Sequence, residues 1–171
     1  MNKKQLTTKE ITKIAMMAVL VFIATYSLKV PALNGYTHIG DSMIFIAVLL
    51  LGGKKGAISG AIGAALADLL GGYMIWILPT FCIKYIMAII MGIIIEKVLV
   101  DIRFNWIIGA CLGGIFQIIA YTAVRIPIYG ISYAIADLYG LILQTISGVI
   151  ISILLITILS GAKVINKLKE I

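Results

Sequence analysis

The chain has 171 residues, of which 62% are hydrophobic and 12% carry a charge, whereas a soluble domain carries about 25% charged residues. No soluble core can hide so much apolar surface, so the composition excludes an ordinary soluble protein. The net charge of +7 does not indicate nucleic-acid binding here, because the basic residues lie in short segments between apolar runs.

The apolar runs predict an all-α integral membrane protein, a compact bundle of six transmembrane helices that forms a single membrane domain over residues 1–171. Each span needs about 20 apolar residues, which leaves no room for a separate soluble domain. The first run lacks a small-residue cleavage site, so we expect a retained helix. In chain order the predicted spans are 11–28, 39–51, 56–70, 75–95, 104–124 and 138–159.

Basic residues near the span ends predict the orientation. One side holds Lys29 and Arg125, and the other side holds Lys3, Lys4, Lys9, Lys13, Lys54, Lys55, Lys97, Arg103, Lys163, Lys167 and Lys169. The positive-inside rule then places both termini in the cytoplasm. Loops 30–38, 71–74 and 125–137 face outward, and polar and aromatic residues gather in them.

The first outward loop is a candidate lid over a binding site. Asn34, Tyr36 and His38 can form hydrogen bonds or stack, and glycines at 35 and 40 permit tight bends. His38 lies near Asp41, but no nucleophile, metal set or second histidine accompanies the pair, so catalysis is disfavoured. A structural hydrogen bond at the start of the second helix is the favoured interpretation of His38.

Lone polar residues within spans are costly in lipid and usually face the bundle interior, a cavity or a partner. Lys84, in the fourth span, shares a helix face with Thr80 and Trp76 at four-residue spacing, with Tyr85 beside it. This stripe predicts a ligand contact. The equally weighted alternative is that Lys84 locks helices together by pairing with Asp68, Asp41 or Asp137.

The fifth and sixth spans carry further polar stripes. Gln117, Tyr121 and Arg125 recur every four residues up to the outer surface and can line a pocket. Alternatively, Arg125 reaches the outer headgroups and Tyr121 belongs to the aromatic belt of the membrane interface. Asp137 and Gln144 are seven residues apart on nearly one face, although an acid at a helix start also suits the helix dipole.

Small residues spaced four apart allow close helix contact in lipid. For Gly56, Gly60, Gly63 and Gly113 we expect internal packing. On the first helix, Ala15 and Ala18 can instead receive a second membrane protein. No glycine pair is followed by the Gly-Lys-Ser/Thr of a phosphate loop, so the sequence predicts a membrane protein that has no ATPase site of its own and is not an enzyme.

Segments 36–41 (YTHIGD), 50–57 (LLGGKKGA) and 67–73 (ADLLGGY) resemble, in order and spacing, the S components of energy-coupling factor (ECF) vitamin transporters. The resemblance covers nearly the whole chain. It is strongest to the subgroup that carries hydroxymethylpyrimidine, pyridoxine and riboflavin.

This resemblance implies a subunit of a prokaryotic plasma membrane that captures a vitamin from outside and delivers it only when joined to a transmembrane coupling subunit and two cytoplasmic ATPases. The family docks its coupling subunit through alanines on the first helix, here Ala15 and Ala18. No cofactor or metal is expected. The implied binding residues are Asn34, Tyr36, His38, Tyr73, Trp76, Lys84, Tyr85, Gln117, Tyr121, Arg125, Tyr133, Asp137 and Gln144.

The preferred ligand is hydroxymethylpyrimidine or a vitamin B6 form, with riboflavin or pantothenate behind, and this order follows from the resemblance alone. The alternative function is a stand-alone secondary transporter of a small metabolite, driven by an ion gradient through Asp41, Asp68 or Asp137. These acids lie near the outer ends of the predicted spans, whereas coupling sites usually lie near the midplane, which disfavours that alternative.

Overall fold

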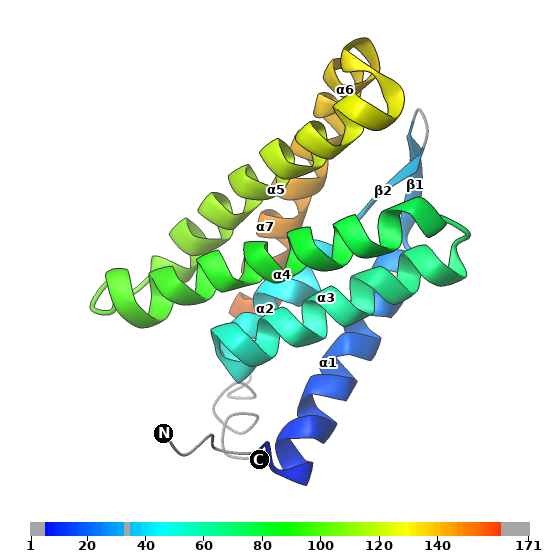
Figure 1. Ribbon diagram of the computed structural model, residues 1–171. Helices are drawn as coiled ribbons and strands as arrows, with labels where there is room; N and C mark the ends of the chain where they lie inside the picture. The colour runs from blue at the N-terminus through cyan, green and yellow to red at the C-terminus, as the bar shows by residue number, and fades with distance from the viewer. Residues whose placement is uncertain (1–5, 33–34, 162–171) are drawn as a thin grey trace, which may run out of the picture.

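The computed structural model describes residues 6–32 and 35–161, and within them the protein is a helical bundle with one short hairpin (Figure 1). The elements are α1 (Thr8–Tyr26), β1 (Lys29–Ala32), β2 (Gly35–His38), α2 (Gly40–Leu51), α3 (Gly53–Leu70), a 3₁₀ turn η1 (Met74–Trp76), α4 (Ile77–Ile93), a π-helical turn η2 (Ile94–Val98), α5 (Asn105–Tyr129), α6 (Ile131–Ala136) and α7 (Leu138–Gly161).

Among the described residues, three helical segments are long and apolar enough to cross a membrane, and they are Met74–Val98, Asn105–Tyr129 and Ile131–Ser160. The shorter α2 is also apolar. In α3, small residues replace large apolar ones, and Lys54, Lys55 and Asp68 lower its hydropathy further. The protein is therefore an all-α membrane protein, while six crossings and cytoplasmic termini stay predictions.

A β-hairpin stands where the sequence predicted an irregular loop. β1 and β2 are antiparallel, with Lys29 opposite His38 and Ala32 opposite Gly35. A two-stranded hairpin alone is marginally stable in water. Here β2 leads directly into α2, and the Thr37 hydroxyl donates to the Gly140 carbonyl of α7 at 3.5 Å. These contacts attach the hairpin to the bundle.

The fifth helix is longer than predicted. α5 continues past Val124 to Tyr129, with Pro127 inside it, and Gly130, at φ +86°, separates it from the short α6. Tertiary contacts support this extension, because Tyr129 stacks on Trp76 with ring centroids 6.2 Å apart. Arg125 therefore lies on a helix and not in a loop.

Small residues bring the helices into close contact, as predicted for Gly63, where a Cβ would lie 2.4 Å from the Ala18 carbonyl of α1. A further close contact, which was not predicted, joins α4 to α3, because a Cβ on Gly92 would lie 2.4 Å from the Gly53 Cα. Beside these contacts, Phe45, Ile44 and Met87 form part of the hydrophobic core and are completely buried.

One end of the bundle is held by basic and acidic residues. Lys55 pairs with Glu10 at 2.5 Å, and Glu96 accepts a hydrogen bond from the Gly53 amide at the start of α3 at 2.6 Å. The hairpin and α6 lie at the opposite end (Figure 1). The first end is the one that the charge distribution predicts to be cytoplasmic, although Lys3, Lys4 and the lysines after residue 161 lie outside the described residues.

Candidate functional site

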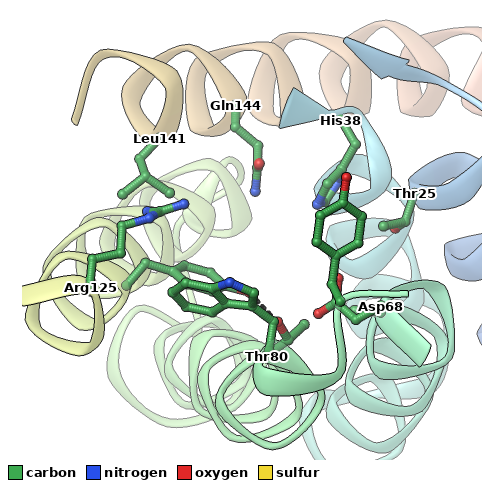
Figure 2. Close-up of a pocket in the computed structure, with 11 residues that line it drawn as sticks. Thr25, His38, Asp68, Thr80, Arg125, Leu141 and Gln144 are labelled. Carbon is green, nitrogen blue, oxygen red and sulfur yellow. Dashed lines mark hydrogen bonds between the residues drawn. The ribbon is translucent and has the colours of Figure 1, made fainter. Parts of the chain in front are cut away.

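A pocket opens near the hairpin end of the bundle, with about 540 Å³ of empty space that includes its open mouth. Side chains from α1, α3, α4, α5, α7, β2 and the α3–α4 connection surround it (Figure 2). The lining residues are Thr25, His38, Ala64, Asp68, Tyr73, Trp76, Thr80, Tyr121, Arg125, Leu141 and Gln144.

Two aromatic side chains pack together in the apolar part of the pocket lining. The rings of Trp76 and Tyr121 lie 5.8 Å apart at 51° to each other. The Tyr121 hydroxyl donates to the Thr80 hydroxyl at 3.1 Å, which fixes the ring. The η1 turn places Trp76 at the start of α4, where its indole is 8% exposed. Such a pair offers flat surfaces against which a planar ring can stack.

Arg125 brings a positive charge to this aromatic wall. Its guanidinium carbon lies 5.3 Å from the centre of the Trp76 ring and 5.6 Å from that of Tyr121. Nη2 pairs with Asp137 Oδ2 at 2.7 Å. Nε and Nη1 are buried and have no hydrogen-bond partner among the described residues. These two nitrogens are therefore left to donate hydrogen bonds to a ligand.

His38 lies at the end of the hairpin and is neutral. Its Nδ1 accepts a hydrogen bond from the Gly40 amide at 3.1 Å. Burial lowers the pKa of His38 from 6.5 to about 4, and the nearby Asp41 carboxylate only partly opposes this. With Nδ1 as an acceptor, the single proton of the neutral ring is on Nε2. The sequence favoured a structural hydrogen bond of the His38–Asp41 pair at the start of the second helix, and the bond found there joins Nδ1 to the Gly40 amide.

A fully buried polar network joins four helices close to the pocket. Lys84 Nζ on α4 donates to Asp41 Oδ1 on α2 at 2.5 Å and to Gln117 Oε1 on α5 at 2.6 Å. Asp41 Oδ2 accepts from Gln117 at 2.8 Å and from Gln144 on α7 at 3.1 Å. Gln117 also donates to Thr145. Lys84 thus pairs with Asp41, one of the three partners considered from the sequence.

Six of the predicted binding residues line the pocket, namely His38, Tyr73, Trp76, Tyr121, Arg125 and Gln144. Lys84 and Gln117 lie in the network and do not line the pocket, and Asp137 holds Arg125. Tyr85 packs against the hydrophobic core and stacks on Phe81, and the Tyr133 ring lies 4.9 Å from that of Tyr129. Tyr36 pairs with Pro31 in the hairpin. Asn34 lies outside the described residues.

The predicted docking patch on the first helix is only half exposed. Ala15 faces outward, whereas Ala18 is 6% exposed and packs against Gly63 of α3. Close packing of two helices at a glycine covers Ala18, and spacing along one helix does not reveal the neighbouring helix. Of the two alanines, Ala15 is the one accessible to a partner.

Several lining residues were not among the binding residues named from the sequence. Thr80 lies on the predicted stripe between Trp76 and Lys84, so its spacing was a usable signal. Ala64 and Asp68 are four residues apart on α3. Thr25 gave no signal, because a single threonine near the end of an apolar helix is common. Among the described residues no three His, Cys, Asp or Glu side chains gather closely enough to hold a metal ion.

Comparison with known proteins identifies relatives of the chain. The model of a family described as "ECF-type riboflavin transporter, S component" matches residues 5–161. A protein of Pyrococcus woesei, described as an uncharacterized protein in a gap 3' region, is 36% identical over 134 residues, which cover 78% of this chain and 88% of the relative.

Proposed function

Because the chain belongs to the ECF-type riboflavin transporter S component family, we propose that it is the substrate-capture subunit of an ATP-driven vitamin importer and that its pocket binds riboflavin. The family consists of membrane transport subunits and not enzymes. In this proposal the chain crosses the membrane six times with both termini in the cytoplasm. A transmembrane coupling subunit and two ATPases supply the energy.

The lining of the pocket supports a ligand that combines flat rings with polar groups. Trp76 and Tyr121 offer a flat apolar wall, and polar groups lie around it. A three-ring flavin with a hydroxylated chain uses both features. Riboflavin replaces hydroxymethylpyrimidine and the vitamin B6 forms, which were preferred from the sequence, because the matching family is described by riboflavin.

The charges around the pocket support an uncharged ligand. Lys84 is compensated by Asp41, and Arg125 by Asp137. Asp68 lines the pocket, and the Lys29 ammonium lies 5.7 Å from the centre of the Tyr73 ring, which also lines it. With His38 neutral, the three acids are matched by three bases. This balance disfavours pantothenate, which carries a carboxylate, and suits riboflavin.

Isothermal titration of the purified protein with riboflavin, hydroxymethylpyrimidine, pyridoxine and pantothenate tests the choice of ligand. Riboflavin should bind most tightly. Trp76→Ala should weaken its binding by about 2 kcal/mol or more, the loss expected when a central aromatic anchor is removed. Trp106→Phe is the matched control, because Trp106 packs in the core cluster with Met91 and does not line the pocket. Tight binding of another vitamin, with none of riboflavin, would reject the flavin.

Liposomes test the energy source. The protein alone should bind riboflavin without accumulating it, and accumulation should require the coupling subunit, the ATPases and ATP. Ion-driven accumulation by the protein alone would instead establish the secondary transporter. Two of that transporter's candidate acids, Asp41 and Asp137, are already held in ion pairs, which disfavours them as carriers of an ion.

A further inference from the structure

Thr25 and Arg125 line the pocket and hold buried polar atoms to which no other described residue forms a hydrogen bond. The Thr25 hydroxyl has no hydrogen-bond partner among the described residues, and this side chain is 2% exposed. Arg125 Nε and Nη1 are also buried and have no hydrogen-bond partner among the described residues. Buried polar atoms nearly always have a partner, so unsatisfied atoms that line an open pocket point to a bound molecule.

The two groups lie on different sides of the cavity. Figure 2 shows Arg125 and Leu141 on one side, with Thr25, His38 and Asp68 on the other. The surroundings also differ. Arg125 stands over the aromatic rings of Trp76 and Tyr121. Thr25 stands where α1 meets the start of α2, because a Cβ added to Gly40 would lie 2.0 Å from the Thr25 hydroxyl oxygen.

The chemistry of each group selects a different part of a ligand. A guanidinium only donates hydrogen bonds, and it donates in its own plane, so Arg125 suits carbonyl oxygens at the edge of a ring stacked on its aromatic neighbours. A threonine hydroxyl both donates and accepts. Thr25 therefore suits another hydroxyl, and the Asp68 carboxylate on the same side can accept from further hydroxyls.

We propose that Arg125 and Thr25 fix the orientation of the bound ligand, with a carbonyl-bearing aromatic ring at Arg125 and a hydroxylated chain at Thr25. This inference rests on the proposed function, because it takes the ligand to be a flavin. It adds a specificity-determining residue on α1. Thr25 then discriminates between flavins with and without the hydroxylated chain, and Arg125 does not.

Two ligands and two variants test the orientation. Lumiflavin has the same three rings as riboflavin and a methyl group in place of the ribityl chain. Thr25→Val, which keeps the shape and removes the hydroxyl, should weaken riboflavin binding about three- to tenfold, the range expected for one neutral hydrogen bond. Lumiflavin binding should stay unchanged. Arg125→Lys, which keeps a charge beside Asp137 and loses the planar donors, should weaken both ligands by the same factor.

Thr122→Val is the matched control, because the Thr122 hydroxyl bonds to the Ile118 carbonyl of its own helix at 2.7 Å. It should change neither affinity. If Thr25→Val weakens both flavins equally or neither, the orientation is wrong while flavin capture stands. If the unaltered protein binds neither flavin, the proposed function is wrong and the orientation fails with it.

Discussion

The buried pair of Lys84 and Asp41 gives the sharpest test of what holds the pocket end of the bundle together. Both side chains are completely buried, and Lys84 Nζ lies 2.5 Å from Asp41 Oδ1. Lys84→Met keeps much of the lysine's length but leaves the Asp41 carboxylate without its counter-charge. Breaking a buried pair from one side costs about 3–5 kcal/mol, because the remaining charge stays desolvated. That loss is a large part of a stability of about 5–15 kcal/mol.

The double variant Lys84→Met/Asp41→Asn should recover most of this loss. It removes both charges, and the new amide can still bond to Gln117. Replacing a buried pair by neutral groups of similar volume is often neutral or stabilising. The effects of the two single variants should therefore be strongly non-additive.

The assay is unfolding of the purified protein in mixed micelles as the fraction of SDS rises, followed by circular dichroism. Lys55→Met is the matched control. Lys55 also pairs with a carboxylate at 2.5 Å, that of Glu10, but these side chains are 35% and 33% exposed, so its loss should be much smaller. Single-variant effects that add within about 0.5 kcal/mol would refute the coupling.

Three further outcomes follow from the structure. Burial holds the pKa of His38 at about 4, below the ordinary 6.5, so the histidine destabilises the fold as the pH falls from 6.5 towards 4. His38→Asn, which keeps an acceptor, should shrink the drop in melting temperature between pH 7 and pH 4.5. Gly92→Ala should cost about 1–3 kcal/mol in SDS unfolding, because its Cβ would lie 2.4 Å from the Gly53 Cα; an unchanged midpoint would contradict the close contact. Ala15→Leu should reduce co-purification with the coupling subunit and leave ligand affinity unaltered, whereas Ala123→Leu on α5, at a position that is also exposed, should change neither.

The spacing of residues in the sequence predicted well which of them share a helix face. It predicted poorly which of them lie at the level of the pocket along the helix. Four-residue repeats placed Trp76 with Lys84 and Tyr121 with Gln117 on shared faces. In the structure Trp76 and Tyr121 line the pocket, while Lys84 and Gln117 lie in the buried network. Periodicity gives the angular position of a residue about the helix axis. The position of a cavity along that axis depends instead on how several helices cross.

Contacts between distant segments could not be predicted from the sequence, because they too depend on how several helices pack against one another. Thr25 reaches the pocket because α1 packs closely on α3 through Gly63 and ends beside the start of α2. The hairpin was missed because its strands, Lys29–Ala32 and Gly35–His38, have only four residues each. Such short strands carry too little alternation to recognise, and contacts with the helices support them.

Asp41 preorganises one side of the pocket through Gln144, which lines it. One carboxylate accepts hydrogen bonds from Lys84, Gln117 and Gln144, which come from three other helices. Gln144 is therefore held in place before a ligand arrives, with its amide nitrogen committed to Asp41. A lining side chain that does not rearrange lowers the entropy lost on binding and favours tight capture. Release of the ligand then has to begin at lining residues outside this network, and not at Gln144.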